Sequence, residues 1–153
     1  MKKYLILFTS FVLLSCENKI DAPSEINELF SYYNKAWSDG KVEDIIDNVY
    51  GVPCTLYLPD GVVPLNSKND IRNFLNNTFS ELDKNNYGFS KFNNWEHVRL
   101  SQNVAIVEQN FTRYLKDGMV MGPKERTASY VLGKDEDSKY KIYALIVHSP
   151  LSE

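Results

Sequence analysis

The stretch that decides the fold is residues 104–116, which read Val104-Ala105-Ile106-Val107-Glu108-Gln109-Asn110-Phe111-Thr112-Arg113-Tyr114-Leu115-Lys116. The odd-numbered residues of this stretch are the more apolar set, and a period of two is typical of a β-strand with one face on a core. Segments 89–100, 121–133 and 140–148 have the same strand character. The connections between the four are short, which favours antiparallel hairpins. We therefore expect an antiparallel sheet in the C-terminal half.

Two amphipathic helices are predicted near the start of the chain. Ser24 follows Pro23 and can cap a helix whose apolar residues recur at helical spacing up to Trp37, and Gly40 ends it. A second short helix spans residues 42–49, and Tyr50-Gly51-Val52-Pro53 breaks it.

A β-hairpin and a third helix come next. Pro59-Asp60-Gly61 is a turn signal that joins strands 54–58 and 62–65. Ser67-Lys68-Asn69-Asp70 resembles a capping box with Asp in its third position, and the helix that it opens ends near Asn85. Helices first and strands after them indicate an α+β fold with helices on one face of a curved sheet.

The N-terminus resembles a bacterial lipoprotein signal. Met1-Lys2-Lys3 precedes an apolar run at residues 5–14, and Cys16 follows Leu14-Ser15. An uncleaved anchor is the alternative, but ten apolar residues rise only about 15 Å as a helix, half of a ~30 Å hydrocarbon core. We expect residues 1–15 to be a signal peptide, Cys16 to be acylated, residues 16–23 to form a tether and residues 24–150 to form one domain. The resemblance implies a protein anchored by lipid in the bacterial cell envelope, on the periplasmic side or at the cell surface.

The composition excludes several functions. Loss of Lys2 and Lys3 leaves 15 of the 17 basic residues against 20 acidic ones, a net charge of −5. No basic stripe is present, so we expect no nucleic-acid partner, and attachment to the membrane must come from the lipid. No metal-ligand spacing, glycine-rich phosphate loop or serine nucleophile elbow is present, so no metal and no cofactor are predicted. Cys54 has no positively charged neighbour in the sequence that would lower its pKa, so we expect a small buried apolar residue rather than a nucleophile.

The ordered set of motifs over residues 24–150 resembles the nuclear transport factor 2-like (NTF2-like) superfamily, in its SnoaL-like branch. The segments that carry this resemblance are Phe30-Ser31-Tyr32-Tyr33-Asn34-Lys35-Ala36-Trp37, Tyr50-Gly51-Val52-Pro53-Cys54, Pro59-Asp60-Gly61, Asn66-Ser67-Lys68-Asn69-Asp70-Ile71, residues 104–118 and residues 141–150. The resemblance implies a cone-shaped fold, in which a strongly curved, mainly antiparallel sheet wraps around three N-terminal helices and leaves an apolar pocket open at one end. The superfamily includes isomerases, dehydratases, cyclases and an epoxide hydrolase besides proteins that only bind, so the fold does not fix the function.

The odd residues of 104–116 are expected to face the helices. Gln109 and Arg113 belong to this set and should therefore lie inside the cone or at its mouth. The guanidinium of Arg113 is suited to bind the carboxylate or enolate of a ligand. The alternative is an ion pair with an acidic residue near the helix ends, such as Asp39 or Glu43. We predict that a small apolar or aromatic molecule contacts a ligand-binding set of Trp37, Tyr57, Trp95, Gln109, Phe111 and Arg113.

Two histidines are the candidates for catalysis. His97, in a pocket with Tyr57, has the chemistry of a general base near neutral pH, although a partly exposed strand histidine is the simpler interpretation. His148 ends the last strand, where it either lines the pocket rim or ties down the C-terminus through a hydrogen bond. Asp60 is explained by its turn. Catalytic residues therefore remain unassigned, and no inward-facing carboxylate of the isomerase kind is visible.

Three functions are consistent with these observations. The first is a lipid-anchored module that binds a small apolar or aromatic molecule, and we favour it. The second is an isomerase, dehydratase or cyclase that uses His97 or His148 as its base. The third is a protein-interaction module. In it the pocket is filled by the protein's own side chains, and the partly apolar outer face of the sheet at Val104, Ile106 and Tyr114 holds a partner or forms a homodimer.

Overall fold

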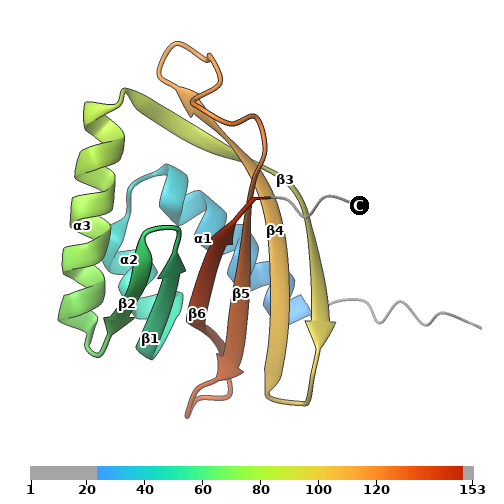
Figure 1. Cartoon of the computed structure of the whole chain (residues 1–153). Coiled ribbons are helices and arrows are strands. Elements are labelled where there is room, and N and C mark those ends of the chain that lie inside the picture. Colours follow the sequence, from blue (N-terminus) through green and yellow to red (C-terminus); the bar gives the residue numbers. More distant parts are fainter. Residues whose placement is uncertain (1–23, 150–153) are drawn as a thin grey trace, which may run out of the picture.

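The computed structural model describes residues 24–149, and these form three helices and six strands (Figure 1). The signal peptide, Cys16 and the tether predicted from the sequence lie outside these residues. The elements in chain order are α1 (Ser24–Ser38), α2 (Val42–Asn48), β1 (Tyr50–Leu58), β2 (Gly61–Leu65), α3 (Lys68–Lys84), β3 (Tyr87–Arg99), β4 (Val104–Leu115), β5 (Arg126–Lys134) and β6 (Tyr140–His148).

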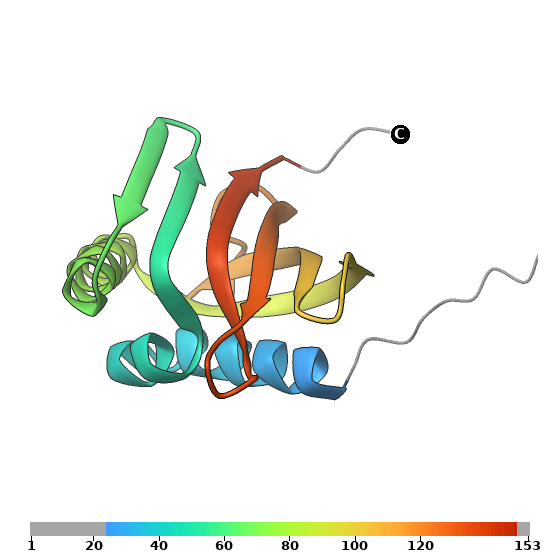
Figure 2. The ribbon, with the colours of Figure 1, turned by 90° about the horizontal axis from the view of Figure 1, so that it is seen from below.

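The strands form one mixed sheet in the order β2-β1-β6-β5-β4-β3. All neighbours are antiparallel except β1 and β6, which are parallel. The sheet is bent and does not close into a barrel, and α1 and α2 lie along one side of it (Figure 2). The α+β fold with a curved, mainly antiparallel sheet is thus confirmed, as are its three N-terminal helices.

The helices begin and end where the sequence predicts. The backbone N–H of Gly40 donates to the carbonyl of Trp37 with a φ of +66°, a conformation that glycine adopts without strain. At α3 the hydroxyl of Ser67 accepts a hydrogen bond from the backbone N–H of Asp70 at 3.2 Å. The carboxylate of Asp70 in turn accepts from the backbone N–H of Asn66 at 3.0 Å, one residue earlier than in the usual capping box.

Two predicted boundaries are wrong. The second helix ends before residue 50, as predicted, but the strand expected to begin at Cys54 begins at Tyr50. The pairing of β1 with β6 is irregular between Tyr50 and Thr55. Pro53 lies in that interval and has no N–H to donate, which explains why this segment does not look like a strand in the sequence. At the other end of the sheet, β5 begins at Arg126, and residues 121–125 belong to the loop before it.

Phe30 of α1 lies at the centre of the core. Its ring is stacked on Trp95 at a centroid distance of 5.8 Å and meets Tyr130 edge-on at 5.1 Å. Tyr33, one helical turn later, contacts Tyr130 and Tyr50 in the same edge-on manner. Aromatic side chains of α1 therefore occupy much of the interior of the cone.

Candidate functional site

A small cavity lies between α1 and the inner faces of β3, β4, β5 and β6. We call it the aromatic cavity, and its volume is about 60 Å³. Its lining residues are Tyr33, Trp37, Ser90, Phe92, Phe111, Arg113, Ala128, Tyr130, Leu145 and Val147. A water molecule occupies about 30 Å³ of liquid and sites for small molecules usually enclose 300–1,000 Å³, so the aromatic side chains leave room for about two waters.

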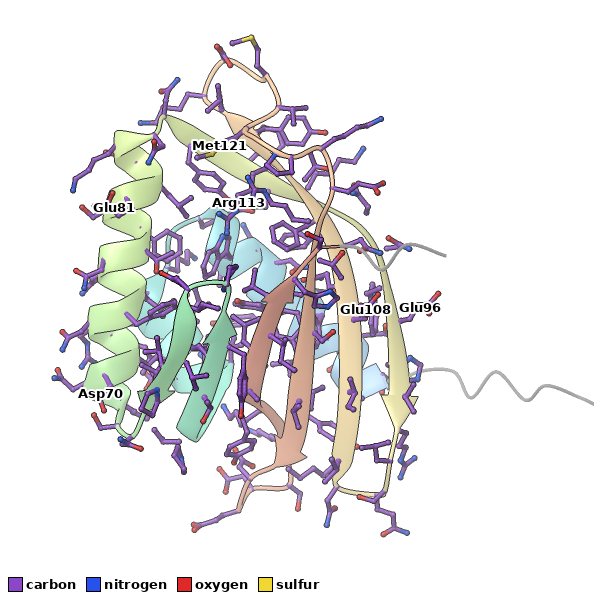
Figure 3. All side chains as sticks on the ribbon, in the orientation of Figure 1. Asp70, Glu81, Glu96, Glu108, Arg113 and Met121 are labelled. Atoms are coloured by element: carbon purple, nitrogen blue, oxygen red, sulfur yellow. The ribbon has the colours of Figure 1, made fainter. Side chains whose placement is uncertain are left out.

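A second hollow adjoins the aromatic cavity at Arg113. It has a volume of about 440 Å³, runs along α3 and is lined by Phe74, Asn77, Thr78, Glu81, Leu82, Asn85, Arg113 and Met121. We call it the α3 groove. Figure 3 shows Arg113 between α3 and the sheet, below Met121, whereas Glu96 of β3 and Glu108, five residues earlier on β4, lie away from α3. Arg113 is a lining residue of both hollows, so its side chain separates them.

The alternation of β4 determines which side chains reach the cavity. Ala105, Val107 and Gln109 are buried against the core, and Phe111 and Arg113 continue the same face into the cavity. The register pairs Phe111 with Phe92 and Arg113 with Ser90, so β3 and β4 contribute matched pairs of lining residues. The inward position predicted for Arg113 is therefore confirmed.

Three buried tyrosines supply neutral hydroxyl groups near the cavity. The hydroxyls of Tyr33 and Tyr50 are 3.1 Å apart, and Tyr130 packs against Tyr33. Burial is the main cause that raises the pKa of all three phenols above the ordinary value, because an ionised phenolate would lose its hydration. Tyr33 and Tyr130 line the cavity and are therefore hydrogen-bonding groups at physiological pH.

Arg113 has no acidic partner among the described residues. The ion pair with Asp39 or Glu43 that the sequence suggests does not form, because Asp39 pairs with Lys35 at 2.8 Å and Glu43 with Arg72 at 2.7 Å. The guanidinium of Arg113 instead lies over the ring of Phe111, with its carbon 5.6 Å from the ring centroid. Burial, and then the neighbouring charge of Arg126, lower the pKa of Arg113 from its ordinary value.

Half of the predicted ligand-binding set lines the cavity. Trp37, Phe111 and Arg113 do, whereas Trp95 is stacked on Phe30 outside it. Gln109 is fully buried and donates from its Nε2 to Asn34 at 3.2 Å. Tyr57 of β1 is 45% exposed.

The two histidines do not line the cavity. His97 is on the inner face of β3, but it lies five residues beyond Phe92, roughly 16 Å along the strand. His97 and Tyr57 do not share a pocket, because β4, β5 and β6 separate their strands by roughly 19 Å along the sheet. The ring of His148 is within hydrogen-bond distance of the Ser129 hydroxyl at 2.9 Å and of the Ser149 carbonyl at 2.7 Å. The cavity lining contains no Asp, Glu or His.

Sequence reasoning missed Tyr33, Tyr130 and Arg126. The register places Arg126 opposite Phe111, and therefore on the inner face of β5 with Ala128 and Tyr130. The period of two that located Arg113 would have found Arg126 and Tyr130, had the strand been started at 126 instead of 121. Tyr33 is on α1, where the helical spacing marks it only as a core residue.

A family model described as "NTF2-like protein (DUF6841)" matches residues 24–150. The chain belongs to this family. Among curated proteins nothing matches. For this NTF2-like protein, the similarity to solved structures is one of fold, since the identities are low.

Three solved structures illustrate that similarity. An NTF2-like protein of unknown function from Shewanella oneidensis is 16% identical with a TM-score of 0.62, over 81% of this chain and 96% of the other. An NTF2-like superfamily protein from Salmonella enterica is 17% identical with a TM-score of 0.63, over 84% and 91%. A ketosteroid isomerase-like protein from Erwinia carotovora atroseptica is 17% identical with a TM-score of 0.62, over 84% and 96%.

Neither a metal site nor a membrane span is found between residues 24 and 149. In that part of the NTF2-like protein, no three His, Cys, Asp or Glu side chains are grouped to hold a metal ion. None of its helices is long and apolar enough to cross a bilayer.

Proposed function

We propose that this NTF2-like protein, of the SnoaL-like branch, is a lipid-anchored binding protein of the bacterial cell envelope that holds a small apolar or aromatic molecule in its cone. The observation that carries the proposal is the aromatic cavity, whose walls are apolar except for Ser90, Arg113 and the tyrosine hydroxyls. Such a lining, with few polar groups to orient the ligand, is typical of small-molecule sites. The absence of carboxylate and imidazole groups from this lining favours binding over acid–base catalysis.

The ligand must enlarge the aromatic cavity to enter it. Arg113 is the side chain between the cavity and the larger α3 groove, and a rotation about its bonds would join the two hollows. We propose that the ligand enters from the α3 groove, because the other walls are formed by strands and by the core face of α1.

The chain's two tryptophans allow a direct test. Trp37 lines the cavity and Trp95 is stacked on Phe30 outside it. Titration of ¹⁵N-labelled protein with benzyl alcohol, a neutral single-ring probe, should shift the indole N–H signal of Trp37 and leave that of Trp95 in place. The variants Trp37→Phe and Trp95→Phe assign the two signals. No shift of the Trp37 signal up to the solubility limit of benzyl alcohol would refute binding in the cone.

The lipid anchor is tested separately, with the chain's second cysteine as the control. Cells that express the protein and grow with a tritiated fatty acid should label the wild type and the Cys54→Ala variant but not the Cys16→Ala variant. Cys54 is buried in β1 and is therefore a poor acceptor for acylation. An unlabelled wild type, or a labelled Cys16→Ala variant, would contradict the proposal.

We further propose that the outer face of the sheet pairs with a second copy of the chain. Val98, Ile106 and Val131 are in direct register across β3, β4 and β5, and Val98 and Ile106 are exposed. On the same face, Tyr114 of β4 stacks with the exposed Phe89 at 4.9 Å. Sedimentation equilibrium should give a dimer for the wild type and a monomer for Ile106→Lys. A wild type that stays monomeric at the highest soluble concentration would contradict this proposal.

A further inference from the structure

Two arginines lie on the inner face of the sheet, on neighbouring strands. Arg113 belongs to β4 and lines the aromatic cavity. Arg126 begins β5, and its register with Phe111 places it on the same face of the sheet. In an antiparallel pair, Arg126 and Arg113 are then diagonal neighbours, about 7–8 Å apart at their backbones. The two side chains are close enough for the charge of Arg126 to lower the pKa of Arg113.

Both guanidinium groups have unsatisfied hydrogen-bond donors. The Nε atoms of Arg113 and Arg126 are buried and have no hydrogen-bond partner within residues 24–149. The Nη2 of Arg126 donates to the carbonyl of Met121 at 3.0 Å, which orients the group but does not neutralise it. Neither arginine takes part in the ion pairs of the described residues.

The neighbouring acidic side chains do not supply the missing charge. Glu81 lines the α3 groove with Arg113, but its carboxylate pairs with Lys84 at 2.7 Å. Glu125 precedes Arg126 in the chain and is exposed. The tyrosine hydroxyls near Arg113 are kept neutral by burial. Arg113 lines the aromatic cavity and Arg126 lies beside it on the same face of the sheet. Neither positive charge has a counter-charge from residues 24–149.

The loop before β5 leaves room for this arrangement. Gly122 has a φ of +71°, and a Cβ atom there would lie 2.7 Å from the Nη2 of Arg126. Residue 122 therefore has to be without a side chain for Arg126 to keep its position.

A buried charge is costly unless it is paired and hydrogen-bonded. The chemical group that satisfies two adjacent guanidinium groups is an oxyanion, and the planar carboxylate matches the donor fork of arginine in two parallel hydrogen bonds. A ring or alkyl chain on that carboxylate would extend among the side chains of the aromatic cavity.

We propose that Arg113 and Arg126 form a carboxylate-binding site, and that the ligand of the cone is a small aromatic or aliphatic carboxylic acid in its ionised form. The inference rests on the proposed function, which supplies the apolar part of the ligand. It adds that the ligand carries a negative charge. Arg113 binds the carboxylate from the wall of the aromatic cavity, and Arg126 binds it from the adjoining strand.

The test compares benzoate with benzyl alcohol, two probes of nearly the same shape that differ in charge. Each is titrated at neutral pH, and Kd is obtained from the shift of the Trp37 indole N–H. The wild type should bind benzoate about tenfold more tightly or better, which is the gain expected from one charge-assisted hydrogen bond. Arg113→Met and Arg126→Met should each abolish the preference, so that the Kd values of benzoate and benzyl alcohol in the same variant agree to within about twofold.

Arg99→Met is the matched control. Arg99 is exposed at the end of β3, and its Nε donates to the Ser101 carbonyl at 3.0 Å. This variant removes the same charge elsewhere and should keep the preference for benzoate. If either methionine variant fails to fold, Arg113→Lys or Arg126→Lys replaces it, since a lysine keeps the charge and loses the fork and should reduce the preference only in part.

The outcomes separate the inference from the proposed function. Equal affinity of the wild type for the two probes, or a preference that survives Arg113→Met and Arg126→Met, would overturn the carboxylate site while leaving an apolar binding site in place. Failure of both probes to shift the Trp37 signal would overturn the proposed function itself. A preference that is lost in both variants and kept in Arg99→Met supports the inference.

Discussion

Among single residues, Arg113 most clearly lowers the stability of the protein for the sake of its proposed function. It carries a charge into a largely apolar interior, where it lies over the ring of Phe111 and where its Nε has no hydrogen-bond partner within residues 24–149. Natural proteins keep such unfavourable groups mainly where function requires them. The stability of the ligand-free protein should therefore improve when the charge is removed.

We predict that Arg113→Met raises the free energy of unfolding of the ligand-free protein by about 1 kcal/mol, or about 2–4 °C in Tm. The reason is that a methionine fills much of the same space without a desolvated charge. Thermal unfolding followed by circular dichroism measures the change, with Arg99→Met as the exposed control. A fall of several degrees would show that Arg113 has a stabilising role that the described contacts do not include.

Cys54 should make the free energy of unfolding depend on pH. Burial raises the pKa of its thiol to about 12, from an ordinary value of 9.0. A folded-state pKa above that of the unfolded chain means that the folded state holds the proton more tightly. This contribution to stability is therefore fully present below pH 9.0 and is lost as the pH rises toward about 12.

Urea denaturation at several pH values between these limits should show the free energy of unfolding falling with pH. The raised pKa values of Tyr33 and Tyr130 act with the same sign. Cys54→Ala removes one titrating group and should flatten the profile without abolishing its slope. A profile that is unchanged by this substitution would contradict the role assigned to the thiol.

At the scale of elements, α3 depends on its N-terminal cap. The Ser67 hydroxyl accepts from the backbone N–H of Asp70, one of the donors that a helix leaves unpaired at its start. We predict that Ser67→Ala lowers the free energy of unfolding by about 1 kcal/mol. Ser80, exposed within the same helix, provides the control, and Ser80→Ala should be neutral or slightly stabilising. Equal effects of the two substitutions in urea denaturation would show that the cap contributes nothing.

The elements also show how far the sequence predicts the structure. Periodicity located the three helices and assigned the inner face of β4, because the side-chain periods of 3.6 and 2 follow from backbone geometry alone. It failed at residues 50–53, where Pro53 disrupts the pattern of β1, and at residues 121–125, which continue the composition of β5 without its pairing. Composition does not reveal where a ladder of hydrogen bonds begins.

Only part of the candidate site was predicted, and the reason is related. Alternation tells which face of a strand a residue occupies, and it placed Phe111 and Arg113 correctly on the inner face. It does not tell which helix covers each position along the strand. Trp95 shares the inner face of β3 with the cavity residue Phe92, yet Phe30 of α1 packs on it. That contact depends on the crossing of α1 over the sheet, which no local pattern specifies.

At the scale of the whole molecule, the two faces of the sheet have separate roles in our account. The inner face and α1 enclose the aromatic cavity, and the outer face carries exposed apolar residues and His148. Ligand binding and pairing of two chains are therefore expected to be independent of each other. The Ile106→Lys variant should keep the affinity of the wild type for benzyl alcohol, measured through the Trp37 signal, even where it lowers the mass seen by sedimentation. A variant that loses both properties together would show that the two faces are coupled.

The central claim is that the cone holds a small molecule against its inner face, and the most direct measurement is of intermolecular nuclear Overhauser effects between bound benzoate and methyl-labelled protein. Ala128 and Leu145 are buried and line the cavity, whereas Val98 and Ile106 are exposed on the outer face. Our account predicts contacts between the ring protons of benzoate and the methyl groups of Ala128 and Leu145. Contacts with Val98 and Ile106 instead, or none with the cavity methyl groups under saturating benzoate, would contradict it.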